Sequence, residues 1–177
     1  MFTFTAFYQH RLSFTNYSTY SFAVIFVLGN LLLPQLTHLI PGGGLIFLPI
    51  YFFTLIAGYK FGLTVGLLTA VLSPVVNNLL FGMPPVFVLP AILIKSCLLA
   101  IIAAIVAAHY KKISLLHILI VVLAYQVIGS AAEWVMIGSF KKATQDFTTG
   151  IPGMLIQVFA GYFLLKKLSG NGNKTVE

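Results

Sequence analysis

Long apolar runs separated by short turns are the feature that most constrains how this chain can fold. The runs cover residues 17–39, 45–59, 61–80, 86–108, 115–139 and 151–168. A helix needs roughly 20 consecutive apolar residues to cross a bilayer, and most of these runs approach that length. Only 7% of the 177 residues are charged and 59% are hydrophobic, which is too little charge to cover a soluble surface. The sequence therefore predicts an all-α integral membrane protein, a bundle of six transmembrane helices.

We expect one membrane domain, residues 1–168, followed by a polar, disordered tail, residues 169–177. The second run is short for a full crossing. Prolines inside the runs predict helix kinks at Pro34, Pro49, Pro74 and Pro90. The single cysteine, Cys97, excludes a disulfide within the chain and a multi-cysteine metal site, and we expect no cofactor.

The positions of the cations predict how the bundle is oriented. Six crossings put both termini on one side, and the side richer in Lys and Arg faces the cytoplasm. The cations on the terminal side are Arg11, Lys60, Lys111, Lys112, Lys166, Lys167 and Lys174. Lys141 and Lys142 fall on the other side. We therefore expect cytoplasmic termini, and we attribute the net charge of +7 to orientation in a lipid bilayer, with no nucleic-acid partner.

Small residues recur every four positions in two segments. They are Gly58, Gly62, Gly66 and Ala70 in one, and Ser96, Ala100, Ala104 and Ala108 in the other. Helices in lipid approach one another closely where small residues line their contact. We interpret both stripes as packing within the bundle; docking of another membrane subunit is the alternative.

Two ionisable side chains lie inside the apolar runs, where each costs about 2.5–3.5 kcal/mol on insertion scales and needs a partner or a function. Lys95 is in the fourth run and Glu133 in the fifth, both in the half of the bundle away from the termini. The spacing i, i+3, i+4, i+7 in the fifth run is occupied by Gln126, Gly129, Ser130 and Glu133. This spacing places polar or small residues on one helix face, which we expect to point inward.

Two interpretations of these polar residues stay open. In the first, Lys95 and Glu133 form a buried ion pair that only holds helices together. In the second, they belong to an outward-opening cavity that binds a small polar molecule, with Lys95 as the counter-ion for a carboxylate or phosphate. The other candidate substrate-binding residues are Gln126, Gln157, Asn77, Asn78 and Trp134, with Gly43 and Met83 as lid residues.

Catalytic motifs are absent from the sequence. Its only triple glycine, residues 42–44, is followed by Leu45 and lacks the Lys of a phosphate-binding loop. Nucleophile elbows and HExxH pairs are also missing. We expect no enzyme, although a membrane enzyme that uses Glu133 and His38 is one alternative. A stand-alone small-solute transporter and a structural or assembly subunit are the others.

Several segments rich in Gly and Pro follow one another in a recognisable order. They are Leu48-Pro49-Ile50, Ala57-Gly58, Phe61-Gly62-Leu63-Thr64-Val65-Gly66-Leu67-Leu68, Leu72-Ser73-Pro74, Leu80-Phe81-Gly82-Met83-Pro84-Pro85, Leu89-Pro90 and Gly150-Ile151-Pro152-Gly153. In this order, over nearly the whole chain, they resemble the substrate-binding S-components of energy-coupling factor (ECF) vitamin transporters.

The resemblance implies a six-helix bundle that captures a vitamin or related micronutrient at its outer face. The ligand site would use the outer halves of helices four to six and the outer loops. The implied partners are a transmembrane coupling subunit and two ATPase subunits, in an ABC-type importer of the bacterial cytoplasmic membrane. Two features differ from the family: Lys95 stands where we expect Glu in the nearest relatives, and the first helix lacks the Ala-x-x-x-Ala docking pattern.

Overall fold

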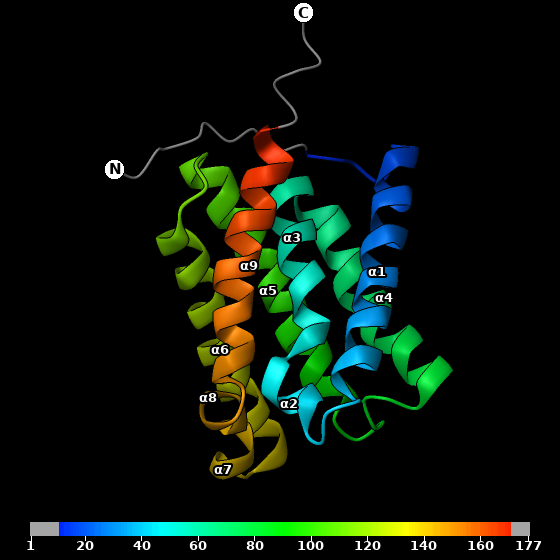
Figure 1. The fold of residues 1–177 in the computed structure, drawn as a ribbon, viewed down its shortest axis with the longest axis vertical. Coiled ribbons are helices and arrows are strands. Elements are labelled where there is room, and N and C mark those ends of the chain that lie inside the picture. Colours follow the sequence, from blue (N-terminus) through cyan, green and yellow to red (C-terminus); the bar gives the residue numbers. More distant parts are fainter. Residues whose placement is uncertain (1–10, 171–177) are drawn as a thin grey trace, which may run out of the picture.

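The computed structural model describes residues 11–170, and within them the regular structure is helical (Figure 1). The long helices are α1 (Tyr17–Thr37), α4 (Leu63–Phe81), α5 (Leu89–Tyr110), α6 (Leu115–Ile137) and α9 (Ile151–Gly170). These 5 helices are long and apolar enough to cross a membrane. The predicted all-α membrane protein is therefore confirmed, with helix ends within a few residues of those expected.

The second predicted crossing is broken into short pieces. They are α2 (Gly43–Phe47), the 3₁₀ turn η1 (Pro49–Tyr51) and α3 (Phe52–Phe61). Leu48 separates α2 from η1 with a left-handed φ of 47°, a conformation that ends the right-handed helix α2. With ten residues, α3 extends over roughly 15 Å, half the thickness of a bilayer's hydrocarbon core.

The short helix α3 occupies the centre of the bundle. It contacts α1, α4, α5 and α9, and Leu55, Ile56, Ala57 and Tyr59 are completely buried. Gly62 alone connects α3 to α4, with a φ of 87° that favours glycine. The chain therefore reverses direction in one residue and packs α4 directly against α3.

Glycines let three helices meet at their backbones. A Cβ at Gly66 on α4 would lie 2.8 Å from Gly58 Cα on α3 and 3.2 Å from Ala100 Cβ on α5. A Cβ at Gly58 would lie 2.9 Å from the carbonyl oxygen of Ala100. The predicted role of these small residues in packing within the bundle is confirmed at this contact.

A buried polar group also fixes α3. The Asn30 amide nitrogen on α1 donates to Thr54 Oγ1 and to Ser73 Oγ, each at 3.1 Å. Its carbonyl oxygen accepts from the backbone N–H of Phe53 at 3.1 Å. The first turn of α3 has no side-chain cap from Tyr51, so Asn30 supplies that cap from another helix.

The prolines predicted to kink helices have different positions. Pro34 and Pro74 lie inside α1 and α4. Pro49 lies at the break before α3. Pro90 is the second residue of α5, where a missing N–H removes no intrahelical bond, so the predicted kink there is wrong.

The start of α1 and the end of α9 lie at the same end of the bundle, which is the top in Figure 1. The opposite end carries α2 and the two short helices α7 (Phe140–Ala143) and α8 (Gln145–Thr148). The expected tail begins inside α9, which includes Ser169 and Gly170. The rest of that tail, with Lys174, and the first ten residues of the expected domain lie outside the described residues.

Candidate ligand-binding site

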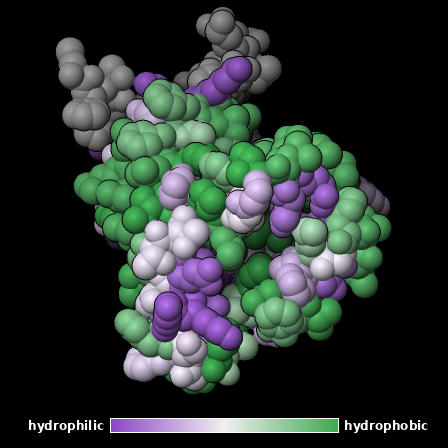
Figure 2. Space-filling model, turned by 60° about the horizontal axis from the view of Figure 1, so that its bottom comes forward, coloured by the Kyte–Doolittle hydropathy of each residue, from purple (hydrophilic) through white to green (hydrophobic). Residues whose placement is uncertain are grey.

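A cavity of about 490 Å³ lies at the end of the bundle formed by α2, α7 and α8. Viewed toward this end, the molecule is hollowed, with hydrophilic residues around the hollow and a largely hydrophobic surface elsewhere (Figure 2). The cavity lining is mostly apolar and includes Leu45 and Pro49 from the broken segment and Met83 and Val88 from the loop before α5. Its volume falls within the roughly 300–1,000 Å³ typical of small-molecule sites.

One wall of the cavity carries a cluster of charged side chains. The ammonium of Lys95 lies 2.8 Å from Asp146 Oδ2 and 2.5 Å from Glu133 Oε2. Lys95 is 3% exposed, and the three residues come from α5, α6 and α8. Glu133 and Asp146 are the acidic residues of the described part of the chain. Every carboxylate side chain between residues 11 and 170 therefore converges on one buried lysine.

The lysine reaches this position because α6 has a glycine opposite its stem. A Cβ at Gly129 would lie 2.5 Å from Lys95 Cγ. The predicted inward face of α6 is confirmed, since Gln126, Gly129 and Ser130 are all buried. Glu133 continues that face at the level of the cavity.

The charged wall has a surplus of negative charge. Two carboxylates face one ammonium, and a charge that is buried without a partner is costly. Lys142 also lines the cavity, but it is exposed on α7 and forms no ion pair with a described residue, so water screens its charge. The ammonium of Lys95 is thus already matched, which does not favour the expected role as counter-ion for an anionic ligand.

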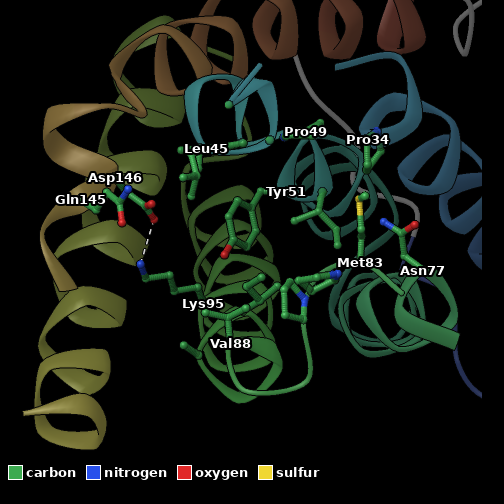
Figure 3. Close-up of a pocket in the computed structure, with 18 of the residues that line it drawn as sticks. Pro34, Leu45, Pro49, Tyr51, Asn77, Met83, Val88, Lys95, Gln145 and Asp146 are labelled. Atoms are coloured by element: carbon green, nitrogen blue, oxygen red, sulfur yellow. Dashed lines mark hydrogen bonds and ion pairs between the residues drawn. The ribbon is translucent and has the colours of Figure 1, made fainter. Parts of the chain in front are cut away.

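A tyrosine hydroxyl points into the cavity from η1. Tyr51 is 3% exposed, and Figure 3 shows its hydroxyl directed toward the wall that carries Lys95 and Asp146. The Tyr51 ring packs 5.5 Å from the ring of Tyr125. Its hydroxyl forms no hydrogen bond with another residue in the described range, so this group is free to bind a ligand in the cavity.

The opposite wall offers amide and imidazole groups. Asn77 is 1% exposed, and its carbonyl oxygen accepts from the Gln35 amide at 3.4 Å. His38 Nδ1 lies 2.6 Å from the carbonyl oxygen of Pro34 and donates to it, which leaves Nε2 as an acceptor. Asn77 and Met83 lie across the cavity from Lys95 in Figure 3. The cavity therefore has a charged wall, an apolar middle and a neutral polar wall.

The structure brings some of the predicted site residues together and separates others. Lys95, Glu133, Asn77 and Met83 line the cavity. The residues that do not line it are Gly43, Asn78, Gln126, Gln157 and Trp134. Both interpretations of the ion pair are thus partly met: Lys95 and Glu133 are paired, and a cavity lies beside them.

Gly43, Asn78 and Trp134 lie outside the lining and have structural contacts. Gly43 is buried on α2, where a Cβ would lie 2.0 Å from the carbonyl oxygen of Thr37. The Asn78 amide donates to the carbonyl oxygen of Pro84 at 2.6 Å and so holds the loop after α4. Trp134 is half exposed and packs edge-on against Phe140 on α7.

The two glutamines lie in the bundle interior, outside the cavity lining. Gln157 on α9 accepts from the Tyr125 hydroxyl at 2.8 Å. Gln126 is completely buried, and neither its amide nitrogen nor its carbonyl oxygen has a hydrogen-bond partner among the described residues. These amides form a polar layer in the core of the bundle.

Sequence reasoning missed Asp146 and Tyr51. Asp146 offered a signal, because it is one of 3 acidic residues in the whole chain and lies in the polar stretch on the same side as Glu133. No sequence signal identified Tyr51, since it lies inside an apolar run that is typical of a membrane helix. Its place in the cavity wall depends on the break at Leu48.

No model of a known protein family, no curated protein sequence and no solved structure matches this chain. Within the described residues, no group of three or more His, Cys, Asp or Glu side chains is arranged to hold a metal ion.

Proposed function

We propose that this chain is the substrate-binding membrane subunit of an ECF-type ABC importer, which captures a vitamin or related small micronutrient. The observation that carries the proposal is the cavity of about 490 Å³ at one end of an apolar helix bundle, with the Lys95, Glu133 and Asp146 cluster in its wall. An apolar cavity with a few convergent polar groups is the usual form of a small-molecule site.

The bundle crosses the membrane six times in this proposal. Its described ends lie at the same end, which requires an even number of crossings. The 5 long helices provide five crossings, and residues 43–61 provide the sixth as a broken segment. A non-helical break at membrane depth is tolerated where it lies inside the protein or lines a cavity, and Leu48 and Pro49 line this cavity.

The cations orient the cavity outward. Lys111 and Lys112 lie at the end of the bundle that carries the chain ends, as do Lys166 and Lys167 in the last turns of α9. By the positive-inside rule this end faces the cytoplasm of a bacterial cell. The cavity then opens to the outside, where a nutrient is captured.

Delivery to the cytoplasm needs energy from other subunits in this proposal. The sequence has no phosphate-binding loop, so ATP hydrolysis is assigned to two ATPase subunits that act through a transmembrane coupling subunit. The chain itself is then a binding protein and no enzyme. Support for these partners comes from the resemblance to S-components.

The proposal is tested by uptake into proteoliposomes. The tagged chain is purified from its own cells with its membrane partners and reconstituted, and accumulation of the ligand that copurifies with the chain is measured with and without internal ATP. We expect uptake only with ATP and with the ATPase subunits present. Uptake by the chain alone would instead establish a stand-alone transporter.

One observation favours a second candidate, a structural or assembly subunit. Lys95 is paired with two carboxylates, which is the contact expected of groups that only hold helices together. The triple variant Lys95→Met, Glu133→Leu, Asp146→Leu separates the candidates. An assembly subunit keeps its function in this variant, whereas a binding subunit folds but loses ligand uptake.

A further inference from the structure

We propose that the ligand of this cavity carries a positive charge, as an ammonium or a cationic heteroaromatic ring, attached to an apolar ring body. This inference rests on the proposed function as a binding subunit and names the chemical class of its substrate. It follows from the charges and the shape of the cavity wall.

Two carboxylates and one ammonium leave the charged wall with one negative charge that has no cation beside it. Lys95 neutralises only one of the two carboxylates, and the side chains of Glu133 and Asp146 are each 12% exposed. Carboxylates so far removed from water are costly unless a cation pairs with them. A cationic ligand restores neutrality, whereas an anionic ligand adds to the repulsion.

One oxygen of each carboxylate is also available to accept a hydrogen bond from a ligand. Lys95 contacts Oε2 of Glu133 and Oδ2 of Asp146, and within residues 11–170 no group donates a hydrogen bond to the second oxygen of either carboxylate. Each ionised carboxylate can accept several hydrogen bonds. These two oxygens and the hydroxyl of Tyr51 form an acceptor set for an ammonium or a ring N–H.

The other basic side chains of the lining leave this surplus in place. Lys142 is exposed at the rim of the cavity. His38 is on the neutral polar wall, with its Nδ1 bonded to the backbone of α1. Neither residue forms an ion pair or a hydrogen bond with Glu133 or Asp146.

The apolar lining in the middle of the cavity favours an apolar body for the part of the ligand that does not carry the charge. Between the charged wall and Asn77, the lining includes Leu45, Pro49, Met83 and Val88 (Figure 3). These side chains offer contact area without hydrogen bonds. The Tyr51 ring adds an aromatic face, and a cation next to such a face is attracted to it. A flat apolar ring that bears the cation fits this arrangement.

Three indole compounds of similar shape test the charge directly. Tryptamine carries an ammonium, tryptophol a hydroxyl and indole-3-acetate a carboxylate. Their affinities for the full-length protein in lipid nanodiscs are measured by isothermal titration calorimetry. We expect tryptamine to bind at least tenfold more tightly than tryptophol, which corresponds to about 1.4 kcal/mol, and indole-3-acetate to bind most weakly.

Matched variants assign the preference to the carboxylates. Asp146→Asn and Glu133→Gln keep the side-chain shape, and each should remove most of the preference for tryptamine over tryptophol. Lys141→Gln, at an exposed position of α7 outside the cavity lining, is the control and should preserve it. The inference is overturned if tryptamine has no advantage, if indole-3-acetate binds best, or if none of the three compounds binds.

The compound that copurifies with the protein distinguishes an error in the ligand class from an error in the proposed function. The compound that copurifies with the wild-type chain is identified by mass spectrometry, independently of any variant that fails to fold. A copurified cation supports both proposals. A copurified anion leaves the binding function in place and overturns the cationic class, whereas absence of any compound together with absence of uptake overturns the function itself.

Discussion

The stem of Lys95 crosses α6 at Gly129, so closely that a Cβ on residue 129 would lie 2.5 Å from Lys95 Cγ. This contact lets the ammonium reach Glu133 on α6 and Asp146 on α8 at the same time. The geometry of the charged wall therefore depends on the absence of a single methyl group.

Gly129→Ala should displace the Lys95 side chain and weaken ligand binding by about tenfold or more, because the cluster loses its geometry. The added methyl overpacks the contact, so we also expect a loss of stability of about 1–3 kcal/mol. Binding is measured by calorimetry and stability by thermal unfolding in detergent. Val127→Ala, at an exposed position of the same helix, is the control and should bind as the wild type does. Wild-type affinity in Gly129→Ala would show that the contact does not shape the site.

Asn30→Leu should destabilise the bundle by about 3 kcal/mol or more. The substitution leaves the N–H of Phe53 and the hydroxyl of Ser73 without their partner, and each unsatisfied buried group costs about 1–3 kcal/mol. The Thr54 hydroxyl keeps its contacts with the carbonyl oxygen of Ile50 and with Ser96 Oγ. Leu32→Ala, at an exposed position of α1, is the control and should change stability little. The comparison uses thermal unfolding of both variants; equal midpoints would contradict the capping role of Asn30.

Gln126→Met should raise stability by about 1–2 kcal/mol and leave ligand affinity unchanged. Its amide is completely buried with no partner among the described residues, so an apolar side chain of similar size removes a cost. Gln157→Met should instead lower stability, because it removes the acceptor of the Tyr125 hydroxyl. Thermal unfolding and calorimetry on both variants check this contrast. Loss of binding in Gln126→Met would show that Gln126 takes part in ligand binding.

Gly66→Ala should destabilise the protein by about 1–3 kcal/mol through overpacking, since its Cβ would lie 2.8 Å from Gly58 Cα on the facing helix. Val71→Ala, at an exposed position of α4, is the matched control. Both are compared by unfolding in a graded series of denaturing detergent. A neutral effect of Gly66→Ala would mean that α3 and α4 can separate without cost.

Much of the helix layout could be predicted from the sequence, because apolar length alone decides which segments enter a bilayer. The expected run 115–139 became α6, Leu115–Ile137, and the run 17–39 became α1, Tyr17–Thr37. The run 45–59 was harder to interpret. Its hydropathy is that of a membrane helix, and only Pro49 indicated that the backbone breaks there.

The site was predictable only in part. Depth in an apolar run identified Lys95 and Glu133, since a charge in lipid needs a partner. Helical spacing identified the inward face of Gln126 but could not say whether a ligand or another helix covers it. Asp146 comes from a loop that folds back as α7 and α8, and such a contact over 51 residues follows from the tertiary fold and not from any local pattern.

Native mass spectrometry of the protein released from lipid nanodiscs shows whether the cavity beside Lys95 holds a small molecule. Ala91 lines the cavity and is 5% exposed, so Ala91→Phe places a ring inside it; Ala131→Phe, at an exposed position of α6, is the control. We expect one small molecule bound to the wild type and to Ala131→Phe, and none to Ala91→Phe. A wild type that never retains a small molecule, or an Ala91→Phe variant that retains it equally well, would show that the cavity is not a ligand-binding site.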